Sequence, residues 1–132
     1  MLQELPSILV VSASNSGRKN LARCLGNLAY RVLWEEQSRD GLAVLSGESD
    51  KIVAVILDKD MQGMSIEQWA AAARRMTSRI AFLLWAPNAE PGEALDRVAA
   101  VARVHAVLLS PVDTDSLDKA ISQAISLRVS YG

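Results

Sequence analysis

The chain has 132 residues, of which 50% are hydrophobic and 22% charged, with a formal net charge of −1 and a single cysteine, Cys24. This length predicts one domain, 1–132, with one core, and the small net charge argues against nucleic acid or an anionic membrane as a partner. One cysteine excludes an internal disulfide, and because no signal-like leader or membrane-length apolar run is found, we expect a cytoplasmic location.

Short apolar runs alternate with segments in which apolar residues recur at helical spacing, which predicts buried strands alternating with amphipathic helices. In chain order the expected strands are 7–12, 31–34, 52–57, 80–84 and 106–109. The first expected helix carries Leu21, Cys24, Leu25, Leu28 and Ala29 inward, and the second carries Leu42, Val44 and Leu45 and ends at Gly47. The third expected helix spans 66–76. The fourth has an inward face made of Leu95, Val98, Ala99 and Ala102, and the fifth has one made of Leu117, Ala120, Ile121, Ala124 and Ile125.

Several helix starts are marked by capping residues. Ser65 and Gln68 have the spacing of a capping box, and Asp113 is a suitable N-cap for the last helix. The polar turn 13–18, together with Ser12, supplies several candidate caps for the first helix, and this role explains its serines better than a phosphate-binding loop does. Pro91 suits the first turn of the fourth helix.

Five strands alternating with five helices predict an α/β fold, a three-layer sandwich with a parallel sheet between two helical layers. The flavodoxin-like strand order 2-1-3-4-5 is the common solution at this size. In that order the first and third strands are neighbours, so Ser12 and Ala13 are expected beside Asp58.

Asp58 is the strongest candidate for a functional residue. Six apolar residues, Ile52 to Leu57, precede it, and four of them are β-branched, which is typical of a central parallel strand. In open parallel sheets, ligands and chemistry occupy the crevice at the carboxyl ends of the strands. Asp58 should therefore lie in that crevice.

Three segments resemble the receiver domain of two-component response regulators. They are Ile8-Leu-Val-Val11, Val55-Ile-Leu-Asp-Lys-Asp-Met-Gln-Gly-Met-Ser65 and Val107-Leu-Leu-Ser-Pro111. The resemblance extends from Ile8 to about Leu127, and it implies a receiver fold in which Asp58 has the position of the phosphoacceptor.

The other positions of the receiver site depart from the family pattern. The resemblance places Ser12 and Ala13 at the acidic pair, Trp85 at the Ser/Thr, Ser110 at the lysine and Val107 at the switch aromatic. Asp60 matches the family position whose backbone carbonyl contacts the metal. Pro111 matches the family's proline, which is preceded by a cis peptide bond.

These losses predict a pseudo-receiver, a domain that keeps the fold without the chemistry. Phosphoryl transfer depends on Mg²⁺ and fixed cations around the transferred group, and neither is supplied at the matching positions. We therefore expect no metal, no cofactor and no enzymatic activity, with the Trp85 ring folded over the mouth of the crevice. An ion held by Asp58 and Asp60 alone is also not expected.

The expected activity is protein binding. By resemblance, the interface is expected near Glu93 to Arg103 and Ser116 to Arg128, with a kinase, an output domain or a second copy in a homodimer as partner. Three alternatives remain: an atypical receiver still phosphorylated on Asp58, a flavodoxin-like module that binds a small molecule beside Ser12 and Ser110, and a structural dimerisation unit.

The remaining distinctive residues are interpreted structurally. Cys24 is expected in the core, and His105 in a surface loop before the fifth strand. Trp69 fits either a core position or an exposed anchor, and Trp34 falls in the outer strand. The basic residues Arg74, Arg75, Arg97 and Arg103 are interpreted as solvated helix faces.

Overall fold

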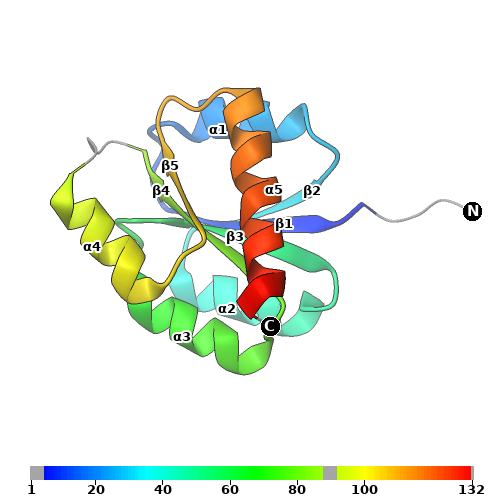
Figure 1. Ribbon diagram of the computed structural model, residues 1–132, viewed down its shortest axis with the longest axis vertical. Coiled ribbons are helices and arrows are strands. Elements are labelled where there is room, and N and C mark those ends of the chain that lie inside the picture. Colours follow the sequence, from blue (N-terminus) through cyan, green and yellow to red (C-terminus); the bar gives the residue numbers. More distant parts are fainter. Residues whose placement is uncertain (1–4, 88–91, 132) are drawn as a thin grey trace, which may run out of the picture.

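The computed structural model describes residues 5–87 and 92–131, and in them strands and helices alternate strictly (Figure 1). The predicted elements are all present, with ends shifted by a few residues. In chain order they are β1 Ser7–Val11, α1 Arg18–Gly26, β2 Arg31–Glu35, α2 Ser38–Glu48, β3 Ile52–Asp58, α3 Ile66–Met76, β4 Ala81–Ala86, α4 Glu93–Ala102, β5 Ala106–Leu109 and α5 Thr114–Tyr131.

The five strands form one parallel sheet in the order β2-β1-β3-β4-β5, as predicted. Val11 at the end of β1 pairs with Leu57 of β3, and Asp58 pairs with Trp85 of β4. The carboxyl ends of β1, β3 and β4 therefore meet at one edge of the sheet, with Asp58 between its neighbours.

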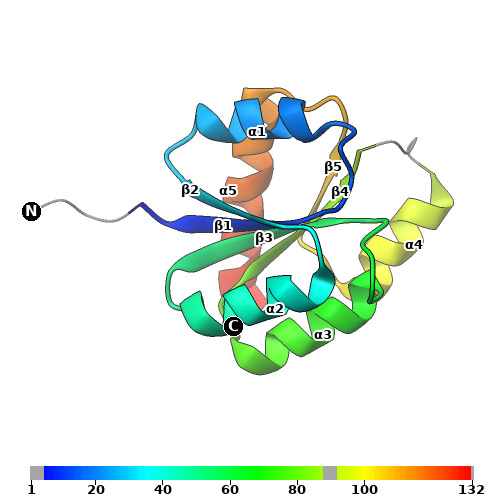
Figure 2. The ribbon, with the colours of Figure 1, turned by 180° about the vertical axis from the view of Figure 1, so that it is seen from behind.

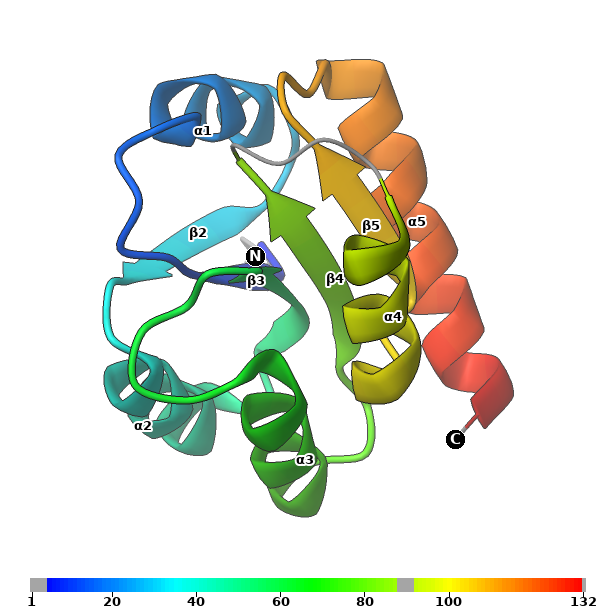
Figure 3. The ribbon, with the colours of Figure 1, turned by 90° about the vertical axis from the view of Figure 1, so that its left-hand side faces the viewer.

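Helices α1 and α5 cover one face of the sheet, and α2, α3 and α4 cover the other (Figures 1 and 2). Successive residues of β4 point to opposite faces, as in any strand. Leu83 and Trp85 pack with the α1–α5 layer, whereas Phe82 and Leu84 pack with the other layer. Figure 3 shows α4 beside α3, in front of β4 and β5.

Two of the predicted caps are confirmed by hydrogen bonds. The Ser65 hydroxyl accepts from the Gln68 amide at 3.1 Å, and the Gln68 side chain accepts from the Ser65 amide at 3.2 Å. Asp113 accepts from the Ser116 amide at 2.8 Å at the start of α5. Pro91 lies outside the described residues.

Other local predictions were wrong. The N-cap of α1 is Gly17, in a left-handed conformation with φ 75°, and no side chain caps this helix. Gly47 lies within α2 rather than at its end. Because α1 ends at Gly26, Ala29 is exposed, and Val98 of α4 also faces solvent.

Within the described residues, every helix is too short or too polar to traverse a lipid bilayer.

Candidate functional site

The Asp58 carboxylate is buried at the carboxyl edge of the sheet, where it is 1% exposed. The hydroxyl of Ser12 donates to its Oδ2 at 2.7 Å, and the amide of Asp60 donates to its Oδ1 at 2.9 Å. Ser12 follows β1 directly, so the predicted contact between the two strand ends is confirmed. Both carboxylate oxygens are thus bound by the protein itself.

The serines after β1 build the loop that closes this edge. Ser12 Oγ, while donating to Asp58, accepts from the Ser14 amide at 3.1 Å. Ser14 Oγ in turn accepts from the Ser16 amide at 3.2 Å. Such side chain to backbone bonds compete with helix formation, which is why these serines shape the loop and do not cap α1 as predicted.

Trp85 fills the crevice from within. Its side chain is 0% exposed and packs in the α1–α5 layer, and its indole Nε1 donates to Ser110 Oγ at 3.1 Å. We expected the ring over the mouth of the crevice. The ring instead lies in the core, on the same face of the sheet as Asp58, with which Trp85 pairs.

Gly17 is the residue that lets the loop close over the indole. A Cβ at Gly17 would lie 3.1 Å from Ser110 Oγ and 3.2 Å from Trp85 Cζ2, and its φ of 75° is one that side chains disfavour. The Gly17 backbone therefore packs closely against Ser110 and the Trp85 ring, with no room for a side chain between them.

A second loop is fixed against α1 by Asn20. Its side-chain amide donates to the Val112 carbonyl at 2.8 Å and accepts from the Val112 amide at 2.8 Å. This pair of bonds holds the segment that contains Ser110 and Pro111, whose peptide bond is cis, as the resemblance implied. Sequence reasoning missed Asn20 and the closing role of Gly17, since both act through residues distant in the chain.

The charges near Asp58 do not provide a cation for its carboxylate. Lys59 Nζ pairs with Asp60 Oδ1 at 2.9 Å, and the Asp60 carbonyl accepts from Gln62 Nε2 at 3.4 Å. Ala13 is exposed and supplies no ligand. In the part of the chain that the structure describes, no three His, Cys, Asp or Glu side chains gather in a metal-binding group.

This donor set does not fit Mg²⁺, which takes oxygen ligands in a near-octahedral shell and is held in proteins by carboxylates. A hydroxyl and an alanine stand where a carboxylate pair would be needed, and the carboxylate that is present already accepts two hydrogen bonds. The side chain of Val107, at the switch-aromatic position, is 38% exposed and lies outside this cluster.

Other residues singled out in the sequence have mixed outcomes. Cys24 is in the core as predicted, and Trp69 is a core residue whose indole donates to the Ser38 carbonyl at 2.8 Å. Trp34 is half-buried in β2, with the Arg18 guanidinium 4.7 Å from its ring centre.

His105 lies in the loop before β5, as predicted, but it is half-buried rather than fully on the surface. Its Nδ1 accepts from the Phe82 amide at 2.9 Å. Arg74 was wrongly assigned to a solvated face, since its guanidinium donates to the carbonyls of Ala102 and Arg103 at 2.8 and 2.6 Å.

Comparison with known proteins places this arrangement in a fold family. No family model and no curated protein matches the sequence. Among solved structures, the chain is similar to a signal receiver domain of an HD domain-containing protein from Pseudomonas fluorescens, with a TM-score of 0.81, 20% identity and coverage of 99% of this chain and 94% of that one.

Two further structures give the same result. A response regulator receiver domain protein from Clostridium thermocellum has a TM-score of 0.78, 22% identity and coverage of 97% and 100%. A chemotaxis response regulator of Vibrio cholerae has a TM-score of 0.73, 19% identity and coverage of 91% and 98%. The chain has the receiver fold. At these identities the likeness concerns the fold alone, and the site must be judged from its own residues.

The bond between Ser12 and Asp58 yields a stability prediction. We expect Ser12→Ala to lower the free energy of unfolding by about 1–3 kcal/mol, because it leaves a buried carboxylate oxygen and the Ser14 amide without their partner. Urea denaturation measures the change. Ser46→Ala, at an exposed position of α2, is the matched control.

The double variant Ser12→Ala/Asp58→Ala should cost less than the sum of the two single changes, because the second change removes the stranded carboxylate. A Ser12→Ala protein within about 0.5 kcal/mol of the wild type would contradict the structural role given to this bond.

Proposed function

We propose that the chain is a receiver-like domain of two-component signalling that acts by binding other proteins, without Mg²⁺-dependent phosphorylation of Asp58. The receiver fold and the position of Asp58 at the end of β3 support a place in such a pathway. On this proposal the domain is not an enzyme, needs no cofactor, and works in the cytoplasm.

One observation supports the loss of phosphorylation above all: Asp58 is buried and both of its oxygens accept hydrogen bonds from Ser12 and Asp60. An attacking carboxylate must reach a phosphoryl donor in line. Here Asp58 is 1% exposed, and its strand neighbour Trp85 is also buried. Both residues therefore belong to the buried interior of the domain.

Electrostatics supports the same conclusion. A phosphoryl group and a carboxylate repel one another, and catalysis of their reaction consists mostly of fixed positive charge placed around the transferred group. At the lysine position, Ser110 accepts a hydrogen bond from Trp85 instead. The adjacent Lys59 is paired with Asp60.

For protein binding we assign the face formed by α4, β5 and α5. It exposes apolar side chains of two of these elements, Val98, Val101, Val107 and Leu109, at 37–52%. The strand β5 is at the edge of the sheet, where exposed apolar residues favour the binding of another polypeptide chain. The occupant we propose is a second copy of this chain, in a symmetric dimer.

Phosphorylation can be tested directly. We expect the wild-type protein to form no Mg²⁺-dependent adduct with acetyl phosphate or beryllofluoride, because Asp58 has neither access nor counter-charge. Intact mass spectrometry and ¹⁹F NMR detect the two adducts, with a phosphorylatable receiver treated in parallel to show that the reagents are active. An adduct in the wild type that is absent from Asp58→Asn would establish the rival function of an atypical phosphoacceptor.

Self-association has its own test. In sedimentation equilibrium at micromolar concentration, we expect the wild type to dimerise and Val101→Glu to remain monomeric, because the change buries a charge in the apolar face. Met76→Glu is the control, since Met76 is 45% exposed against 52% for Val101 and ends α3, outside this face. A monomeric wild type, or equal behaviour of the two variants, would overturn the assigned dimer face.

A further inference from the structure

A cavity of about 590 Å³ opens at the edge of the sheet opposite to Asp58. It lies between the C-terminal ends of α3, α4 and α5 and the starts of β4 and β5. Its lining residues are Arg74, Thr77, Ser78, Ile80, Phe82, Ala99, Ala100, Arg103, Val104, His105, Leu127 and Arg128.

The charged residues of this cavity are all basic. Arg74, Arg103 and Arg128 line it, and no aspartate or glutamate does. Among the described residues, none of these three arginines pairs with a carboxylate. Three guanidinium groups around one cavity, with no carboxylate among the described residues that line it, form an unusual surface, because clustered like charges repel one another.

Backbone carbonyls hold two of the guanidinium groups in place. Arg74 donates to the carbonyls that end α4 and lies 4.5 Å over the centre of the Phe82 ring. Arg128 donates to the carbonyls of Val53 and Arg79. These bonds fix the positions of the two cations, and the carbonyls that end α4 offset only part of the charge of Arg74. Two bonds also use only two of the five N–H groups of Arg74.

Neighbouring arginines add to the effect of burial on two pKa values in this cavity. Burial, and then Arg103, lower the pKa of Arg74 below its usual value. Burial, Arg74 and Arg128 lower the pKa of His105, in that order, and a backbone hydrogen bond with Phe82 opposes them. An anion between these groups would relieve their repulsion.

We propose that this cavity binds a phosphate-bearing small molecule of about nucleotide size. Guanidinium groups match phosphate oxygens in bidentate geometry, and Ser78 and Thr77 add hydroxyl groups to the lining. The volume falls in the range of small-molecule sites and exceeds what an isolated phosphate fills. Ile80, Ala99 and Leu127 provide apolar walls for the rest of the ligand.

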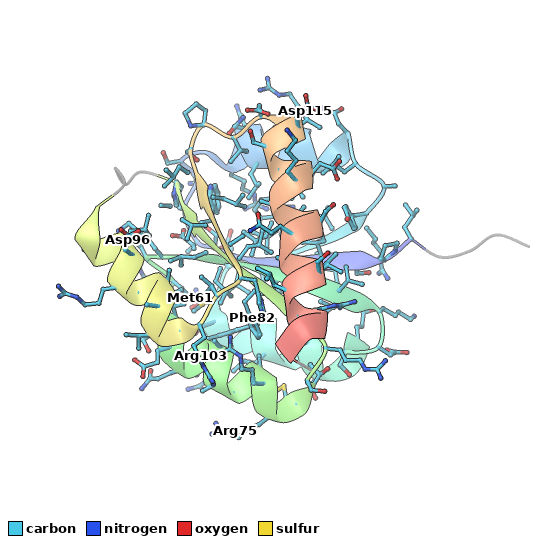
Figure 4. All side chains as sticks on the ribbon, viewed as in Figure 1. Met61, Arg75, Phe82, Asp96, Arg103 and Asp115 are labelled. Atoms are coloured by element: carbon cyan, nitrogen blue, oxygen red, sulfur yellow. The ribbon has the colours of Figure 1, made fainter. Side chains whose placement is uncertain are left out.

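Arg103 is the residue that tests this site most cleanly. Figure 4 shows it at the end of α4 near Phe82, whereas Arg75 points outward from α3. No side-chain hydrogen bond to another described residue depends on Arg103, so Arg103→Gln removes a cation without removing a structural bond. Arg75→Gln is the matched control, because it removes the same charge from an exposed position outside the cavity.

The probes are pyrophosphate and ADP, measured by isothermal titration calorimetry and by ¹H–¹⁵N NMR at ionic strength matched with chloride. We expect saturable binding to the wild type and to Arg75→Gln, and an affinity lower by about tenfold or more for Arg103→Gln. ADP should bind more tightly than pyrophosphate, because its base and ribose reach the apolar walls. The amide signals of Phe82 and His105 should move on binding.

Failure of both probes to bind at millimolar concentration would overturn the proposal, and so would equal affinities of the two variants. Pyrophosphate binding as tightly as ADP would overturn the assigned ligand size. The site lies at the edge of the sheet away from Asp58, so none of these results depends on whether Asp58 is phosphorylated.

Discussion

The hydrogen bond from Ser12 to Asp58 determines what the carboxyl edge of this sheet can do. It joins two neighbouring strands through a buried carboxylate, at 2.7 Å. A carboxylate in the same place would add negative charge and attract a metal ion. The hydroxyl of Ser12 instead donates a hydrogen bond to the carboxylate of Asp58. The hydroxyl at this position contributes to the packing of the strand ends, since removing either partner would cost the other one of its two hydrogen bonds.

The other residues around Asp58 also contribute packing contacts rather than charge. Trp85 brings a large apolar ring to the centre of the edge, and its polar atom is satisfied by Ser110. Gly17 allows the loop after β1 to lie against that ring, and Asn20 fixes the opposite loop through Val112. Each contact makes the edge more stable and less open.

The fold and the place of Asp58 could be predicted because they depend on local pattern: an unbroken β-branched run before an acid, alternating with helical spacing elsewhere. The capping box at Ser65 could also be predicted from the sequence, since both of its partners lie within four residues. The direction of the Trp85 ring could not be predicted, because it depends on the register of β4 against β3. Arg74 and His105 were misjudged for a related reason: their partners, on α4 and β4, are more than 20 residues away.

The most direct measurement is a titration of the ¹⁵N-labelled protein with MgCl₂, observed by ¹H–¹⁵N NMR. The amide of Asp60 reports on the carboxylate, because it donates to Asp58 Oδ1, and the amide of Ser14 reports on Ser12. We predict that neither signal shows a saturable shift at millimolar Mg²⁺ and that Asp58→Asn behaves as the wild type does. A saturable shift at these two amides that Asp58→Asn abolishes would show a metal site at Asp58 and contradict the proposal that the domain acts without Mg²⁺.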